Sequence, residues 1–127
     1  MVRQGTLKLK AQLFCGDEPA IGPGKADLLE AIDREGSISA AGRSMGMSYR
    51  RSWLLVDSMN RCWAERLVET TAGGGASKGA RLTDCGRTVL ESYRALERRL
   101  ADAAARGGLD DLTALMREQP LPPNAKP

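Results

Sequence analysis

The sequence contains no histidine, and its three cysteines, Cys15, Cys62 and Cys85, stand far apart along the chain. Histidine is the side chain most often used as a general acid or base, and structural zinc sites need clustered cysteine or histidine ligands. These absences argue against histidine-based catalysis and against a paired-cysteine metal site. No other set of carboxylates or thiols points to catalysis, so we expect a protein that is not an enzyme and needs no metal or cofactor.

Long apolar runs are also missing, since no stretch approaches the roughly 18 consecutive apolar residues that a membrane-spanning helix needs. Cys15 follows Leu13 and Phe14, as in a lipid-attachment site, but Lys8 and Lys10 interrupt the apolar segment that such a signal requires. Scattered cysteines are typical of a reducing compartment. We therefore expect a cytoplasmic protein that does not bind a membrane.

The length of 127 residues and the 42% hydrophobic content are enough for one domain with its own core. Positive charge is concentrated in the middle of the chain. Residues 37–81 carry seven Lys and Arg against three Asp and Glu, whereas residues 1–36 have a net charge of −1 and residues 82–127 are balanced. A basic patch attracts nucleic-acid phosphates, although a net charge of +3 also occurs in many proteins that bind no nucleic acid.

The segment from Gly36 to Trp53 predicts two short helices joined by a tight turn at Gly46. Ser39 is the predicted N-cap of the first helix, and Ser48 is the predicted N-cap of the second. Spacing of i, i+3, i+4 and i+7 predicts the buried face of the second helix: Ser52, Leu55, Val56, Met59 and Trp63. The predicted solvent-facing side chains of the second helix are those of Tyr49, Arg50, Arg51 and Arg61. This is the pattern of a helix-turn-helix, whose second helix enters the DNA major groove.

The flanking segments predict a small sheet element on either side of the helices. Residues 7–14 alternate apolar and polar side chains, which predicts one strand, and residues 26–36 predict a helix that ends at Gly36. Residues 67–71 and 80–82 predict two strands around a glycine-rich loop, which together form a wing.

Thr83 or Asp84 is the predicted N-cap of a long final helix, and one or two further helical turns are predicted after Gly107 and Gly108. Prolines close to the C-terminus prevent more helix, so we expect the last eight residues to be disordered. The expected division is a domain over residues 1–106, which includes the long helix, and a short, partly disordered tail over residues 107–127.

This order of elements resembles the N-terminal DNA-binding domain of ModE-type, molybdate-responsive transcriptional regulators, with a weaker likeness to LysR-type winged helices. The resemblance runs from about Leu7 to about Ala104, and its more specific pieces are Gly36 to Ser39, Met47 to Arg50, Trp53, Met59-Asn60, Thr71 to Gly79 and Leu82-Thr83. It implies an α+β, mainly helical winged helix-turn-helix with a long C-terminal dimerisation helix, which binds double-stranded DNA at a palindromic operator. Full-length members also carry a C-terminal molybdate-binding region. No residues here correspond to that region, so we expect no molybdate binding on this chain.

Arg50 and Arg51 lie in the first turn of the predicted recognition helix, where an arginine can bind O6 and N7 of a guanine. The alternative is that they only solvate the helix or contact phosphates. Trp53 is compatible either with core packing or with DNA contact. The complete set of candidate DNA-binding residues is Ser39, Ser48, Tyr49, Arg50, Arg51, Trp53, Lys78 and Arg81.

The long helix carries an apolar seam formed by Val89, Tyr93, Leu96 and Leu100. Such a seam either docks on the domain's own core or forms a homodimer interface, and a palindromic operator favours the dimer. An alternative function is a protein-interaction adaptor, or a subunit of a larger regulator, that keeps the winged-helix scaffold without DNA binding. The cationic residues of the recognition helix and wing argue against that alternative.

Overall fold

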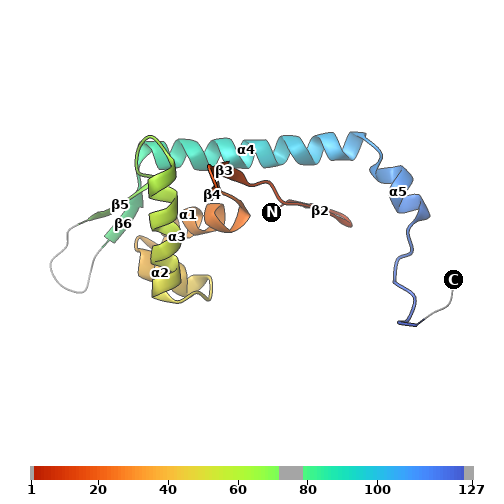
Figure 1. The fold of residues 1–127 in the computed structure, drawn as a ribbon, viewed down its shortest axis with the longest axis horizontal. Helices are drawn as coiled ribbons and strands as arrows, with labels where there is room; N and C mark the ends of the chain where they lie inside the picture. Colours follow the sequence, from red (N-terminus) through yellow and green to blue (C-terminus); the bar gives the residue numbers. More distant parts are fainter. Residues whose placement is uncertain (1, 72–78, 125–127) are drawn as a thin grey trace.

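The structure, a computed structural model, describes residues 2–71 and 79–124. Figure 1 shows a compact group of three helices and a wing at one end of a long helix, α4. The helices are α1 Pro23–Glu35, α2 Ile38–Ser44, α3 Tyr49–Cys62, α4 Asp84–Arg106 and α5 Leu109–Leu115. The strands are β1 Val2–Gln4, β2 Leu7–Leu9, β3 Leu13–Cys15, β4 Glu18–Ile21, β5 Val68–Thr71 and β6 Gly79–Leu82. This is a winged helix, and the predicted fold class is confirmed.

The core is built around α1, which begins with Pro23 at a first-turn position and ends at Gly36, where φ is 80°. Proline fits the start of a helix because its missing N–H has no partner there, and glycine adopts the left-handed conformation at the end without strain. The side chains that α1 buries pack against the inner faces of α2 and α3 and against the base of the wing. The largest fully buried side chains are those of Ile21, Leu28, Leu29, Ile32, Met59, Leu67, Val56, Val68 and Ser52.

The prediction of a single strand over residues 7–14 is wrong, because this stretch contributes to two separate antiparallel hairpins. β2 pairs with β1 in the register Gln4↔Leu7, and β3 pairs with β4 in the register Cys15↔Glu18. The turns are the two-residue links Gly5-Thr6 and Gly16-Asp17, and both glycines have φ near 60°. Glycine is favoured at positive φ in two-residue hairpin turns, so these pairs were the sequence signal for the missed strands β1 and β4.

The wing consists of β5 and β6 in the register Val68↔Leu82 to Thr71↔Gly79, close to the predicted strands. Residues 72–78 of the predicted wing loop, with Lys78, lie outside the described residues. The backbone N–H of Ala80 donates to the carbonyl oxygen of Gly36 at 2.8 Å, which ties β6 to the end of α1. The wing is therefore anchored directly to the helical core.

The helix α4 has 23 residues, so it is about 35 Å long, and it extends well beyond the winged helix (Figure 1). Of the two predicted candidates, Thr83 is its N-cap, and the Thr83 hydroxyl accepts a hydrogen bond from the backbone N–H of Gly86 at 3.0 Å. A Cβ on Gly86 would lie 2.1 Å from the carbonyl oxygen of Leu67. Only glycine lets the first turn of α4 approach the wing this closely. None of the helices in the described part of the chain is both long enough and apolar enough to cross a bilayer.

Candidate nucleic-acid interface

The first helix of the helix-turn-helix, α2, begins two residues earlier than predicted. Its N-cap is Ser37, whose hydroxyl accepts a hydrogen bond from the backbone N–H of Ala40 at 3.0 Å. The prediction that Ser39 caps this helix is wrong. Ser39 lies inside α2, and its hydroxyl accepts a hydrogen bond from Arg43 at 2.7 Å. The earlier start buries Ile38 in the core, which explains why the first of the two serines is the cap.

The two helices of the motif meet at Gly42 and Ser52, both of which are buried. A Cβ on Gly42 would lie 2.2 Å from the hydroxyl oxygen of Ser52. That hydroxyl donates to the carbonyl oxygen of Ser48 at 2.9 Å, so it is held in place at the crossing. The predicted turn at Gly46 is confirmed by its φ of 70°, and the backbone N–H of Met47 donates to the carbonyl oxygen of Gly42 at 2.8 Å. These contacts set the angle between α2 and α3.

The recognition helix α3 presents the face that was predicted. Ser48 is its N-cap and accepts a hydrogen bond from the backbone N–H of Arg51 at 3.1 Å. The predicted inner face is buried at Ser52, Val56 and Met59, and it is half-buried at Leu55 and Trp63. The predicted outer face is exposed throughout: Tyr49, Arg50, Arg51 and Arg61.

A shallow hollow of about 450 Å³ lies on the outer face of α3 and is lined by Tyr49, Arg50, Trp53, Leu54 and Asp57. The indole N–H of Trp53 donates to the hydroxyl oxygen of Tyr49, so both rings stand on the exposed side of the helix. Leu54 and Asp57 were not among the predicted site residues. The signal for Leu54 was present, because it is an apolar residue outside the i, i+3, i+4, i+7 stripe that fills the core.

The charges along α3 are divided between its two ends. At the C-terminal end, Arg61 pairs with Glu18 and Asp57, each at 3.0 Å, and these hydrogen bonds raise the pKa of the Arg61 guanidinium. Burial raises the pKa of the adjacent Cys62 thiol, and the nearby Cys15 raises it further. Cys15 and Cys62 therefore lie near each other, although they are well separated in the sequence.

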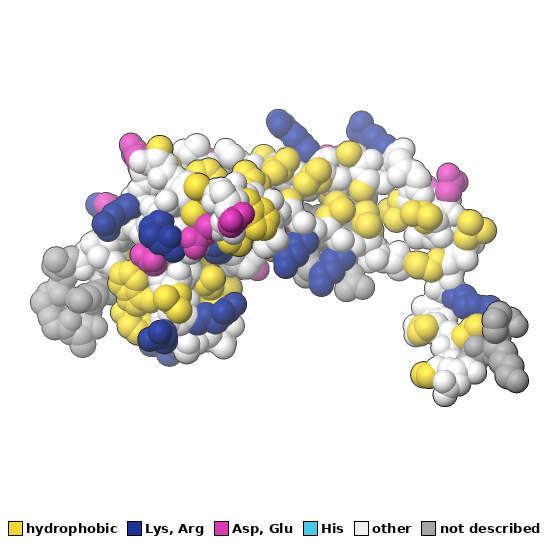
Figure 2. Space-filling view, in the orientation of Figure 1, with side chains coloured by type: hydrophobic (Ala, Val, Ile, Leu, Met, Phe, Trp, Pro, Cys, Tyr) yellow, Lys and Arg dark blue, Asp and Glu magenta, His cyan; other side chains and the backbone are white. Residues whose placement is uncertain are grey.

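At the N-terminal end of α3, neither Arg50 nor Arg51 forms an ion pair with any residue of 2–71 or 79–124. Figure 2 shows basic and apolar side chains next to each other over the region of α2 and α3. The Arg50 guanidinium, which has no ion-pair partner among the described residues, lies beside an apolar hollow, and this combination is suited to a polyanion that also presents apolar groups.

The wing contributes Arg81, whose charge is already paired within the chain. The guanidinium of Arg81 donates to the carboxylate of Glu69 across the β5–β6 pair at 2.6 Å, and both side chains are exposed. Asn60 joins α3 to β5, because its side-chain oxygen accepts from the N–H groups of Leu67 and Val68 at 2.9 and 3.1 Å. A second hollow, of about 320 Å³, lies between α3 and β5. Its lining includes the exposed Arg66, which was not predicted as a site residue.

The apolar seam of α4 is arranged differently from the prediction. Tyr93 is buried within the chain, where its hydroxyl donates to the carbonyl oxygen of Ala11 at 2.8 Å, and burial raises the pKa of Tyr93 to about 12. Val89 is half-buried against the core. The exposed part of the seam consists of Leu96 and Leu100, which are 37% and 40% exposed.

The exposed seam continues onto the β3–β4 hairpin. An apolar groove of about 360 Å³ between α4 and this hairpin is lined in part by Leu13 and Leu96, and Phe14 is also exposed on β3. Figure 2 shows further apolar side chains along the α4 half of the molecule. The apolar surface of α4 is thus partly used inside the chain and partly presented to the outside.

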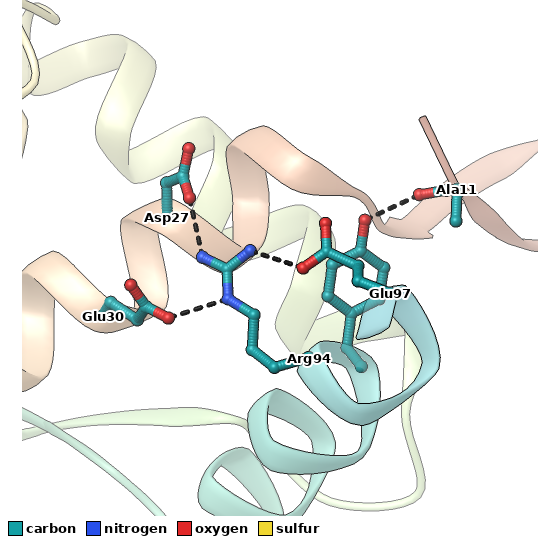
Figure 3. A network of polar contacts seen from close by, with 6 residues as sticks. Ala11, Asp27, Glu30, Arg94 and Glu97 are labelled. Atoms are coloured by element: carbon teal, nitrogen blue, oxygen red, sulfur yellow. Dashed lines mark hydrogen bonds and ion pairs between the residues drawn. The ribbon is translucent and has the colours of Figure 1, made fainter. Parts of the chain in front are cut away.

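One side chain fixes the direction of α4 relative to α1. Arg94 binds Asp27 at 2.7 Å and Glu30 at 2.7 Å on α1, and Glu97 at 2.8 Å on its own helix (Figure 3). Partial burial alone would lower the pKa of Arg94, but the hydrogen bonds that its guanidinium donates to these three carboxylates raise the pKa. Glu97 is buried, which alone would raise its pKa, but the hydrogen bond and the charge of Arg94, together with further polar interactions of this carboxylate, outweigh burial and lower the pKa.

The fold and this surface define a winged helix-turn-helix whose recognition helix is exposed and basic at its start. No family model matches the chain. It is 49% identical to "Molybdenum transport protein ModE" of Azotobacter vinelandii over 70 aligned residues, which are 55% of this chain and 26% of that protein. It is 35% identical to "DNA-binding transcriptional dual regulator ModE" of Escherichia coli K12 over 88 aligned residues, which are 69% of this chain and 31% of that protein.

A third relative is "Molybdenum-pterin-binding protein MopA" of Rhodobacter capsulatus, with 36% identity over 85 residues, which are 67% of this chain and 32% of that protein. The resemblance to ModE-type regulators is therefore confirmed over this part of the chain. The chain matches less than a third of the length of each of these relatives. Among solved structures, the full-length LysR-type regulator LysG from Corynebacterium glutamicum has a TM-score of 0.49 and 22% identity, covering 78% of this chain and 31% of that one.

Proposed function

We propose that this chain is a sequence-specific DNA-binding transcriptional regulator, or the DNA-binding part of one, and that α3 enters the major groove. The observation that carries the proposal is that Arg50 and Arg51, in the exposed first turn of the second helix of a helix-turn-helix, form no ion pair with the residues that the structure describes. In helix-turn-helix proteins, the N-terminal residues of the second helix contact base edges. The relatives named as transcriptional regulators support the same function.

Different roles follow from the directions in which these residues point. Arg50 lines the hollow on the outer face of α3, so we assign it to base reading, whereas Arg51 lies outside that hollow and is assigned to the phosphate backbone. Ser48 and Tyr49 flank the start of α3 and are assigned to phosphates. Ser39 contributes through Arg43, to which it is hydrogen-bonded.

The wing is proposed to contact the backbone next to the major-groove site. Arg81 has to exchange Glu69 for a phosphate, so its contribution should be smaller than that of an unpaired arginine. Lys78 remains a proposed phosphate contact, and it lies outside the described residues.

We further propose that the active form is a homodimer on a palindromic operator. A single helix-turn-helix reads few base pairs, and a two-fold dimer places two recognition helices on half-sites about 34 Å apart. The exposed residues Leu96 and Leu100 on α4 supply an apolar surface, and Leu96 also lines the groove described above. Burial of such a surface is the main source of affinity between copies of one chain.

Selection of duplexes from a random DNA pool tests the proposed function. We expect enrichment of a palindromic motif, and binding to that motif that weakens steeply with salt because arginines displace counterions from the phosphates. Arg106→Ala, at the far end of α4, is the matched control for the variants Arg50→Ala and Arg51→Ala, because it also removes one arginine, and it should bind as the wild type does. If no sequence is enriched, sequence-specific binding is refuted and the adaptor function takes its place.

A further inference from the structure

The outer face of α3 contains a leucine that the fold does not use. Leu54 is 57% exposed, and it stands beside Trp53, which is 39% exposed. A single exposed leucine on a protein surface needs no explanation, but this one lies at the centre of the helix face opposite the buried stripe. It also shares a hollow with Arg50, the residue assigned to base reading.

The spacing places this apolar group within reach of the same few base pairs as the arginine. Leu54 follows Arg50 by four residues, which is about one helical turn or 6 Å along the axis. Successive bases on one strand are about 3.4 Å apart. When Arg50 contacts one base pair, Leu54 therefore lies against a base pair one or two steps away.

The chemistry of the major groove identifies what this side chain can contact. Three of the four bases present only hydrogen-bond donors and acceptors there, and thymine alone adds an apolar group, its C5-methyl. Leu54 has no polar atom, and the Trp53 N–H is already donated to the Tyr49 hydroxyl. The apolar part of the hollow thus complements a methyl group and leaves a donor or acceptor unpaired.

We propose that Leu54, supported by the ring of Trp53, reads a thymine methyl group next to the base read by Arg50. This inference rests on the proposed function, because it requires α3 to enter the major groove. It assigns a specificity-determining residue and a base: each half-site contains a thymine at a fixed distance from the guanine bound by Arg50. Charge supports DNA as the occupant of this surface, since Arg50 in the lining of the hollow and the neighbouring Arg51 form no ion pair within residues 2–71 and 79–124.

Replacement of thymine by deoxyuridine tests the inference, because it removes the methyl group and keeps every hydrogen-bonding atom. In the selected duplex, each thymine is replaced in turn, and the affinity is measured by fluorescence anisotropy. We expect one thymine per half-site at which the replacement weakens wild-type binding about fourfold, the effect of exposing one methyl-sized apolar group. At that position, Leu54→Ala should bind the thymine and deoxyuridine duplexes equally well.

Leu115→Ala removes an exposed leucine from α5 and is the matched control, which should keep the wild-type sensitivity. Thermal melting of Leu54→Ala should match the wild type, because the side chain is outside the core. If the wild type binds the duplex and no thymine is sensitive, or if Leu54→Ala keeps the sensitivity, the methyl inference is overturned while the proposed function stands. If the wild type selects no duplex at all, the proposed function fails and the methyl inference fails with it.

Discussion

At the scale of single residues, the contact between Gly42 and Ser52 gives a direct test of the helix-turn-helix packing. We expect Gly42→Ala to lower the free energy of unfolding by about 1–3 kcal/mol, because the new Cβ would meet the Ser52 hydroxyl at 2.2 Å. Adding Ser52→Ala should recover part of the loss, since the nearest remaining side-chain atom, Cβ, is 3.2 Å away. Chemical denaturation of both single variants and the double variant measures this coupling.

Gly24→Ala is the matched control, because a Cβ on Gly24 has no neighbour within 4 Å and the residue is helical. It should leave stability unchanged or raise it slightly. Independent, additive effects of Gly42→Ala and Ser52→Ala would contradict the contact.

The two arginines of α3 should behave differently when each is removed. Arg50→Ala should cost about 1–3 kcal/mol of specific affinity and relax the preference at one or two base positions. Arg51→Ala should weaken binding to all duplexes alike and reduce the salt slope by about one. Binding to the selected motif and to a scrambled duplex, each at several salt concentrations, separates the two effects. Equal effects of both variants would contradict the assigned roles.

At the scale of elements, Arg94 links α1 to α4, and its loss should be costlier than the loss of a surface ion pair. We expect Arg94→Ala to lower the free energy of unfolding at pH 7 by about 1–3 kcal/mol, because the buried Glu97 carboxylate loses the hydrogen bond that it accepts from a charged donor. Arg87→Ala is the matched control on the same helix. Arg87 makes one exposed pair with Asp33 at 3.0 Å, which contributes about 0–1 kcal/mol.

The same network predicts how stability depends on pH. The pKa of Glu97 is lowered in the folded protein, so the folded state holds its proton less tightly than the unfolded state does. Its contribution is present above the unfolded pKa of about 4.3 and is lost as the pH falls below it. Between pH 6 and pH 3 the wild type should therefore lose more stability than Arg94→Ala. Parallel curves for the two proteins in denaturation experiments would contradict this role.

The elements also show how far local sequence signals reach. The helix-turn-helix, the wing strands and the Thr83 cap were predictable, because each has its own capping residue, turn glycine or apolar spacing. The strand over residues 7–14 was predicted wrongly. The alternation of apolar and polar side chains continues across residues 10–12, but β2 before this link pairs with β1 and β3 after it pairs with β4. Pairing depends on distant residues, such as Tyr93, which binds the carbonyl of Ala11, and alternation alone does not reveal it.

At the scale of the whole molecule, the surface of α4 was only half predictable. The apolar spacing from Val89 to Leu100 indicated one continuous seam, yet Tyr93 is buried and hydrogen-bonded to Ala11, whereas Leu96 and Leu100 are exposed. A helical stripe does not show which of its residues the same chain will cover. The exposed face of α3 was easier to predict, because the capping and core residues of that helix leave one face for solvent.

The exposed part of the seam provides the test of the proposed homodimer. Replacing both Leu96 and Leu100 with glutamate places two charges in the proposed interface and should give folded monomers that bind the selected palindrome much more weakly. Sedimentation at tens of micromolar measures the assembly, and circular dichroism confirms that the helices remain. Leu115→Glu, on α5, introduces a charge at a more exposed leucine and should leave both the dimer and DNA binding intact. A monomeric wild type, or dimers that persist after the double substitution, would show that α4 does not form the two-fold contact that aligns two copies of α3.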